Sequence, residues 1–395
     1  MAKVLNLLEK YDEAISCYKQ ALEIKPNDTV IIKSIAELFE QTNQVHAAKS
    51  AVEKGLKFAP DDTHLNVIAA KCERREGHLQ QAISRLQKID QSNLTPAQSS
   101  AIHYELGRFY DIARNPGQAF DFYSRANKAH AASALGLYEQ KKERFLNGLD
   151  DQLHYFKDTP KILSAPPKPS VGSPCFLIGF PRSGTTLLNQ ILDSHPGITT
   201  LHEKDIVLDI ADKLSASSKG YLQAWEDLSQ NEIEQFRTFY FHNAKKILKR
   251  TWKGYQLIDV HPINISWISL IWRVFPNAKI ILAIRHPYDV CLSCFMQNFL
   301  LNQVTANFFS LEGAAQLYSK FMTLWQSVIR CFPLNYQVVK YENLVADCED
   351  ECRRMFAFLE IEWDDRVLKY YEHARGRKIN TASYHQVSEP IYQHA

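Results

Sequence analysis

The sequence contains no hydrophobic run long enough to cross a membrane and no marked excess of charge of either sign. A membrane-spanning helix needs about 20 consecutive apolar residues, and no stretch of this 395-residue chain approaches that length. The net charge is +2, without the basic footprint of a typical nucleic-acid-binding protein. We therefore predict neither a membrane nor a nucleic acid as partner, and any basic site must be local.

The chain also lacks a disulfide framework and an apolar leader. Its eight cysteines are scattered. Cys291 and Cys294 have the CxxC spacing of redox and metal sites, but no second CxxC or pair of histidines accompanies them. We interpret the cysteines as reduced structural thiols. The N-terminus runs directly into a helical pattern instead of an apolar targeting stretch, so we expect a cytoplasmic location.

The first 130 or so residues repeat themselves. Ala14, Ala48 and Ala82 are separated by a fixed step of 34 residues, and Pro26 and Pro60 keep the same step. About four such units fit, and a period of this length indicates pairs of helices that bury their faces against neighbouring pairs. The pattern resembles tetratricopeptide repeats, with YDEAISCYKQALEIKPND as the best match. Such repeats commonly hold peptides, so peptide or protein binding and a scaffolding role, including a homodimer, both stay open.

After the proline-rich stretch SAPPKPSVGSP the pattern changes. Short apolar runs such as CFLIGF and AKIILAIR are each followed by a helix-like segment. This alternation is typical of a parallel sheet with crossover helices. The predicted fold is α + α/β, an all-α repeat solenoid followed by a P-loop domain. Its parts are helical repeats at 1–140, a linker region at 141–174 and an α/β domain at 175–395.

A glycine-containing loop follows the first predicted strand. Gly179 and Gly184 have the GxxxxG spacing of a P-loop, in which backbone N–H groups and a helix N-terminus bind phosphate. A nucleoside triphosphatase would have Lys after the second glycine, whereas this chain has Thr185. We therefore favour a ligand with one phosphate that carries a transferable group, bound without a metal, over a P-loop kinase. The alternative is a tight turn that only packs the strand on the helix.

A second anion site is predicted where the strand AKIILAIR ends. Arg285 is its last residue, Pro287 begins a helix, and Ser293 lies on that helix. A guanidinium group can donate two parallel hydrogen bonds to a phosphate, and the serine hydroxyl adds another donor. The alternative is an arginine at a strand end and an ordinary helical serine.

The chain resembles bacterial tetratricopeptide-repeat sulfotransferases, which are distantly akin to protein-tyrosine sulfotransferases. FPRSGTTLL resembles their 5′-phosphosulfate loop, and IRHPYDVCLSCF resembles their segment that contacts a 3′-phosphate. The resemblance implies an enzyme of the EC 2.8.2 type, with 3′-phosphoadenosine 5′-phosphosulfate (PAPS) as donor, 3′,5′-phosphoadenosine (PAP) as product and no metal. The donor-binding residues that it implies are Pro181, Arg182, Ser183, Gly184, Thr185, Thr186, Arg285, Ser293, Tyr341 and Ser383.

The resemblance also implies catalytic residues. Glu203 matches the general base of the tyrosine-sulfating branch, and Arg182 would hold the sulfonate and the bridging oxygen. The family usually has Lys in an Asp-Lys-x-Pro segment, where it stabilises the leaving phosphate, but this chain has Val260. Either His261 takes a polar role there or activity is reduced, and His202 is a further candidate.

These observations predict a sulfotransferase that moves a sulfonate from PAPS to a hydroxyl group. The repeats weakly favour a peptide or protein acceptor, such as a tyrosine. The alternative is a nucleotide-binding scaffold with weakened catalysis and a protein-binding repeat domain, in which Val260 marks the lost activity. The sequence leaves the acceptor and the oligomeric state open.

Overall fold

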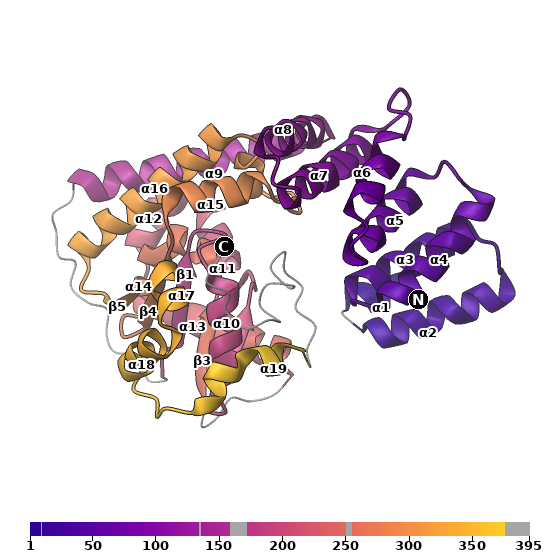
Figure 1. Cartoon of the computed structure of the whole chain (residues 1–395). Coiled ribbons are helices and arrows are strands. Elements are labelled where there is room, and N and C mark those ends of the chain that lie inside the picture. The colour runs from indigo at the N-terminus through magenta and orange to yellow at the C-terminus, as the bar shows by residue number, and fades with distance from the viewer. Residues whose placement is uncertain (9, 134–135, 159–171, 250–254, 376–395) are drawn as a thin grey trace. The chain divides into compact units, whose positions relative to one another are not determined.

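The computed structural model describes residues 1–8, 10–133, 136–158, 172–249 and 255–375 (Figure 1). The chain forms two compact units. The first contains Met1–Glu139 and Phe295–Leu301, and the second contains Gln140–Cys294 and the chain from Asn302 onward. Within the described ranges, no helix is long and apolar enough to cross a membrane.

The first unit is built of short helices that begin at regular caps. Asp28, Asp62 and Thr95 accept hydrogen bonds from backbone N–H groups in the turns that follow them, which satisfies donors that a helix leaves unpaired at its start. The helices are α1 (Ala2–Leu7), α2 (Tyr11–Ile24), α3 (Thr29–Gln41), α4 (Val45–Phe58), α5 (Thr63–Arg75), α6 (Leu79–Gln87), α7 (Pro96–Ile112) and α8 (Pro116–Ser133).

Small residues allow these helices to pack closely. The periodic residues Ala14, Ala48 and Ala82 are fully buried. Gly107 on α7 lies so near the ring of Tyr123 on α8 that an added Cβ atom would meet that ring at 2.8 Å. The 34-residue period therefore marks the positions where helices approach one another.

A buried polar bridge lies inside the first unit. Asn127 on α8 is 1% exposed. Its Nδ2 donates to the backbone oxygen of Phe295 at 2.9 Å, and its Oδ1 accepts from the hydroxyl of Tyr104 at 2.6 Å. The ring of Phe120 stacks on Phe295 with centroids 5.4 Å apart. The segment Phe295–Leu301 thus joins the helices of this unit through both a polar and an apolar contact.

Replacing Asn127 with alanine is expected to lower the free energy of unfolding of the first unit by about 2–3 kcal/mol. The change leaves a buried carbonyl and a buried hydroxyl without partners, and each such loss costs more than an ordinary hydrogen bond contributes. Urea denaturation monitored by circular dichroism measures the effect, with the exposed Asn93→Ala as control. Equal stability of the two variants would show that the bridge does not stabilise this unit.

The second unit is built around a five-stranded sheet with the order β2-β3-β1-β4-β5. All four neighbouring pairs are parallel. The strands are β1 (Cys175–Gly179), β2 (Ile198–His202), β3 (Gln256–Val260), β4 (Lys279–Ile284) and β5 (Asn335–Lys340). The strand order reverses at β1, and ligands in such sheets bind outside the carboxyl ends of the strands at this point. The predicted fold class, a helical array followed by an α/β domain with a parallel sheet, is confirmed.

The remaining helices lie wholly or partly in the second unit. They are α9 (Leu137–Asp158), α10 (Thr185–Asp193), α11 (Ile206–Ser215), α12 (Gly220–Glu226), α13 (Gln230–Leu248), η1 (Pro262–Trp267), α14 (Ile268–Val274), α15 (Pro287–Phe295), η2 (Thr305–Asn307), α16 (Leu311–Cys331), α17 (Tyr341–Ala346), α18 (Cys348–Leu359), η3 (Asp365–Lys369) and α19 (Tyr370–Arg375).

The region 141–174, expected to be a linker, contains most of helix α9. Leu149 and Phe156 on this helix are buried, and the ring of Phe156 makes edge contacts with Trp225 and Phe332 at centroid distances of 5.8 and 5.6 Å. Many charged residues separate its few apolar ones, so the helical period is weak in the sequence. Residues 159–171, which include much of the proline-rich stretch, lie outside the described residues.

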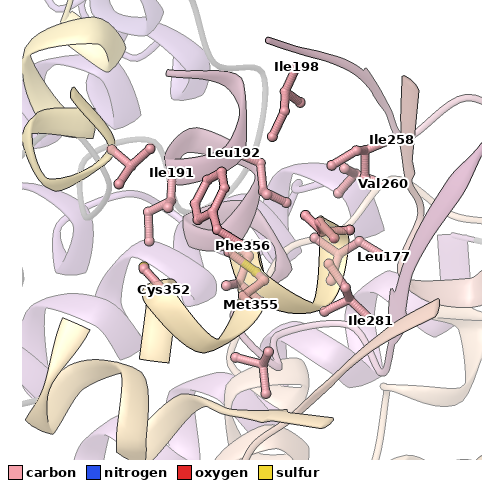
Figure 2. Packing of buried hydrophobic residues seen from close by; sticks show 14 of the residues in the cluster. Leu177, Ile191, Leu192, Ile198, Ile258, Val260, Ile281, Cys352, Met355 and Phe356 are labelled. Atoms are coloured by element: carbon pink, nitrogen blue, oxygen red, sulfur yellow. The ribbon is translucent and has the colours of Figure 1, made fainter. Parts of the chain in front are cut away.

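One face of the sheet carries a hydrophobic core cluster of the second unit (Figure 2). Side chains from all five strands meet side chains from α10 and α18 there. The labelled members are Leu177, Ile191, Leu192, Ile198, Ile258, Val260, Ile281, Cys352, Met355 and Phe356. This packing fixes α10, and with it the loop that leads into that helix.

Candidate functional site

The loop after β1 requires glycine at both ends. A Cβ atom on Gly179 would lie 2.5 Å from the backbone oxygen of Ala283 on β4. Gly184 has a φ of +97°, and a Cβ atom there would lie 2.6 Å from the ring of Tyr341. The first glycine lets the loop start beside β4, and the second supplies a backbone conformation that other residues adopt at a cost. Both glycines of the GxxxxG spacing are therefore required by the local structure, the first by close packing and the second by its backbone conformation as well.

Two contacts join this loop to helix α15. The Nε of Arg182 donates to the hydroxyl oxygen of Ser293 at 2.9 Å. The thiol of Cys294 donates to the backbone oxygen of Pro181 at 3.4 Å. Arg182 has a φ of +73°, a left-handed conformation that is uncommon outside glycine. A strained conformation persists only where the surrounding structure maintains it, and such residues cluster at functional sites.

Arg285 lies at the carboxyl end of β4, beside the same loop. Its guanidinium carbon is 4.5 Å from the centre of the Tyr341 ring. Its Nε makes no hydrogen bond with any described residue, and a carboxylate oxygen of Asp289 lies 3.9 Å away. The turn after Arg285 is fixed by Glu342, which accepts from the backbone N–H of His286 at 2.8 Å. Arg285 is therefore held in place, and its Nε–H is available to donate a hydrogen bond to a ligand.

The loop itself offers a buried hydroxyl. Ser183 is 2% exposed, and its hydroxyl oxygen has no hydrogen-bond partner among the described residues. Thr185, at the start of α10, is also buried. A helix N-terminus attracts anions because its first N–H groups have no partner within the helix. Within the described part of the chain, no group of three or more His, Cys, Asp or Glu side chains is arranged to hold a metal ion.

A second group of polar residues lies at the carboxyl ends of β2 and β3. Glu203 follows β2 with a φ of +48°, and its backbone N–H donates to the oxygen of Val260 at 2.8 Å. Its side chain is 46% exposed, and its carboxylate lies 4.0 Å from Nε2 of His202. Burial lowers the pKa of His202. The carboxylate of Glu203 is therefore accessible to solvent, with a half-buried histidine beside it.

Val260 and His261 differ in their surroundings although they are consecutive. The side chain of Val260 is fully buried in the hydrophobic core (Figure 2). His261 instead pairs through its Nε2 with Oδ1 of Asp205 at 3.0 Å. That hydrogen bond lowers the pKa of the Asp205 carboxyl. Successive side chains of an extended segment point to opposite faces, which agrees with the different surroundings of Val260 and His261.

Asp259 is a buried carboxyl group that sequence reasoning did not single out. It has no exposed surface. The hydroxyl of Tyr240 donates to its Oδ2 at 2.8 Å, and the amide of Asn264 lies 3.4 Å from its Oδ1. Burial raises the pKa of Asp259 to about 6. The carboxyl group joins the end of β3 to α13 and η1, beneath the polar residues of the site.

The raised pKa of Asp259 predicts a pH-dependent stability. In the unfolded chain this pKa is about 3.9, so the folded state holds the proton more tightly. The stabilisation is fully present below that pH and is lost as the pH rises to about 6, a difference of about 3 kcal/mol. We expect Asp259→Asn to melt several degrees higher than the wild type at pH 8 and at a similar temperature at pH 4. Differential scanning calorimetry measures both melting temperatures, with the exposed Asp151→Asn as control. If the melting temperatures of wild type and Asp259→Asn change with pH in the same way, the raised pKa of Asp259 does not affect stability.

The structure brings together several of the residues singled out in the sequence. Arg182 and Ser293 are in direct contact, as are Arg285 and Tyr341, and Tyr341 also borders Gly184. Ser383 lies outside the described residues. Sequence reasoning missed the contacts of Asp205, Cys294 and Glu342. Each lies within two residues of a residue that the sequence singled out, but its residue type alone does not indicate these contacts.

Two segments of the chain match the models of known families. Residues 174–365 match the model of the sulfotransferase family, and residues 1–28 match that of the tetratricopeptide repeat. An uncharacterized protein of Aquifex aeolicus is 24% identical over 404 residues, which cover 99% of this chain and 51% of that protein. Protein-tyrosine sulfotransferase A of Caenorhabditis elegans is 27% identical over 226 residues, which cover 55% of this chain and 57% of that protein.

The chain spans about half the length of these two relatives. Among solved structures, the sulfotransferase domain of the Synechococcus PCC 7002 olefin synthase superposes with a TM-score of 0.37 at 23% identity. That superposition covers 57% of this chain and 87% of the domain.

Proposed function

We propose that this protein transfers a sulfonate group from PAPS to a hydroxyl group, because residues 174–365 match the model of the sulfotransferase family. In this reaction the bond between sulfur and the bridging oxygen of the phosphosulfate breaks, and a bond between sulfur and the acceptor oxygen forms. The products are PAP and the sulfated acceptor, and the hydroxyl proton passes to a base. The chemistry needs two anion sites for the donor and one base for the acceptor.

The hydrogen bond between Arg182 and Ser293 is the observation that carries this proposal. Arg182 belongs to the loop expected to hold the 5′-phosphosulfate, and Ser293 belongs to the helix expected to hold the 3′-phosphate. The 2.9 Å contact between these two residues supports the proposal that the two anion sites are neighbours. PAPS carries both anionic groups on a single ribose, whereas ATP carries its phosphates in one chain and has no group for the second site.

The residues of the two sites suit these anions. We propose that Ser183, Gly184, Thr185 and Thr186 bind the 5′-phosphosulfate through backbone N–H groups and hydroxyls at the start of α10. The buried hydroxyl of Ser183, which has no partner in the described structure, fits this role. Charge-assisted hydrogen bonds from arginine are among the strongest that proteins form.

The second site completes donor binding. Arg285 and Ser293 would bind the 3′-phosphate, and Tyr341 would lie beside the nucleotide because it contacts both Gly184 and Arg285. Pro181 borders the same loop and is fixed by Cys294. The role of Ser383 stays a prediction. When bound, PAPS supplies the activated sulfonate, and the protein supplies the donors that surround it.

We assign the role of base to Glu203. General bases must lie within hydrogen-bond distance of the proton that they accept, and the exposed carboxylate of Glu203 at the carboxyl edge of the sheet is accessible to an acceptor hydroxyl. Arg182 would stabilise the negative charge that builds on the leaving phosphate, which is commonly the largest single contribution to catalysis. The tetratricopeptide repeat supports a peptide or protein as acceptor or partner, and we propose a tyrosine-like hydroxyl.

One observation favours a second candidate function. Val260 is buried in the hydrophobic core and offers no charge at the position of the family lysine. The alternative is therefore a protein that binds PAP through the same two sites and transfers sulfonate slowly or not at all.

A transfer assay separates the two functions. We expect incubation with ³⁵S-labelled PAPS to label peptide acceptors that contain tyrosine, tested beside glycans and simple phenols. Labelling of any acceptor class supports an enzyme and identifies that class. Tight PAP binding without labelling of any acceptor would favour the scaffold, and absence of PAP binding would contradict both.

A further inference from the structure

The turn that carries Glu203 has a strained backbone. Glu203 has a φ of +48°, and left-handed conformations of this kind cost a residue other than glycine about 1–3 kcal/mol. A strained residue keeps its conformation only where its surroundings hold it. Contacts that hold this turn should therefore be visible on either side of Glu203.

Two consecutive residues at the end of β3 hold the turn. The backbone oxygen of Val260 accepts from the N–H of Glu203 at 2.8 Å. His261 pairs through its Nε2 with Oδ1 of Asp205 at 3.0 Å. One contact fixes the backbone of Glu203 itself, and the other fixes the chain two residues later. The side chain of Glu203, which lies between these two positions in the chain, is 46% exposed.

The side chain of Asp205 does not cap the helix that it precedes. Asp205 is the N-cap residue of α11, yet its carboxylate makes no capping hydrogen bond, although aspartate is among the preferred residues for this purpose. The carboxylate pairs with His261 instead. The carboxylate therefore stabilises the contact between the turn and the end of β3, and the start of α11 lacks a side-chain cap.

His261 is the fixed partner of the pair. It is 8% exposed, its backbone N–H donates to the oxygen of Leu177 on β1 at 3.1 Å, and Pro262 follows it at the start of η1. The side chain of Asp205 is 63% exposed. A buried side chain anchored to the sheet therefore restrains an exposed carboxylate on the turn. Other charged or titratable groups of this turn are His202, Glu203 and Lys204.

We propose that Asp205 and His261 form a positioning pair that holds Glu203 in its left-handed conformation and aims its carboxylate at the acceptor. The proposal rests on the proposed function, because it concerns the base of that reaction. His261 is then a positioning residue and does not replace the family lysine. A base displaced by about 1 Å can lose up to about 100-fold in rate, so restraint of this turn matters for turnover.

The test compares Asp205→Ala with two related variants. Asp205→Ala removes the acceptor from a largely exposed position, so the fold should persist. Asp205→Asn keeps an oxygen that can accept from His261. Asp209→Ala is the matched control, because it removes another exposed acidic residue from the first turn of α11 without a contact to His261.

We expect Asp205→Ala to lower kcat about 10-fold with an unchanged KM for PAPS, and to speed hydrogen exchange at the Glu203 amide. Asp205→Asn should retain most of the activity and protection, and Asp209→Ala should behave as wild type. Combining Asp205→Ala with His261→Phe should cost no more than the larger single effect, because both changes break one contact.

Unchanged exchange at Glu203 in Asp205→Ala would overturn the proposal, whatever happens to kcat. The exchange measurement needs no turnover, so it separates this proposal from the proposed function. If Glu203→Gln proves fully active while Asp205→Ala still loosens the turn, the base assignment fails and the positioning contact stands as structure alone. If the turn loosens and kcat does not fall, the role in catalysis is wrong.

Discussion

Arg285→Ala is expected to weaken binding of PAP by about 100-fold. Hydrogen bonds to charged groups contribute about 1.5–3 kcal/mol each, and a guanidinium group can make two of them to one phosphate. Arg285 is pre-positioned by the Tyr341 ring, and its Nε has no competing hydrogen bond within the described structure. Isothermal titration calorimetry with PAP measures the loss directly.

Related variants identify which interaction is lost. Arg285→Lys keeps the charge but cannot form the same paired contacts, so we expect an affinity between those of wild type and Arg285→Ala. Arg366→Ala is the control, because Arg366 is exposed and pairs with Asp364 away from the loop. The same variants should bind 5′-AMP equally well, since it has no 3′-phosphate. A loss of affinity for 5′-AMP as large as that for PAP would assign Arg285 to a different part of the ligand.

Glu203→Gln is expected to lower kcat by about 100- to 10,000-fold, the range that general acid–base catalysis contributes, while PAP affinity stays unchanged. The amide has nearly the same shape as the carboxylate but does not accept the acceptor proton. Initial rates with ³⁵S-labelled PAPS and calorimetry with PAP measure the two quantities. Unchanged turnover would remove Glu203 from the mechanism.

The control for this prediction is Glu362→Gln, an exposed glutamate of the same unit. It should transfer sulfonate at the wild-type rate. Because Glu203 lies in a strained turn, Glu203→Gly should relieve strain and still lose activity. A stable but inactive Glu203→Gly protein would show that the carboxylate, and not the integrity of the turn, is what catalysis requires.

The positions of several residues of the proposed donor site could be predicted from the sequence, because these residues lie at strand ends. The parallel sheet follows from the alternation of apolar runs and helical segments, and this topology brings the carboxyl ends of β1 and β4 to one edge. Gly179, Gly184 and Arg285 lie at this edge, as their places after apolar runs indicated. Ser293 reaches the loop because α15 follows β4 directly.

Contacts between distant segments could not be predicted in this way. The pairing of His261 with Asp205 depends on the register of β2 and β3, which sets His202 opposite Val260. The inclusion of Phe295–Leu301 in the first unit depends on Asn127, far away in the chain. Neither of these two contacts produces a recognisable pattern in the local sequence. Helix α9 was missed because its apolar residues are too few to show a period, although Leu149 and Phe156 are buried.

Val260, which stands at the position of the family lysine, lies in a hydrophobic environment. Val260 belongs to the core that packs α10 against the sheet, and a charge there would need to extend out of this core toward the loop. Val260→Lys therefore combines a packing cost with a restored charge. The donor assignment does not depend on Val260, because the residues proposed to bind the two anionic groups lie on the loop, on α15 and at the end of β4.

Competitive titration of the purified protein with PAP, 5′-AMP and ATP tests the central claim most directly. The two proposed anion sites lie side by side, joined by the contact between Arg182 and Ser293. We expect PAP to bind about 100-fold more tightly than 5′-AMP, since only PAP fills the second site, and ATP to compete weakly. Binding of ATP as tight as that of PAP would contradict the account.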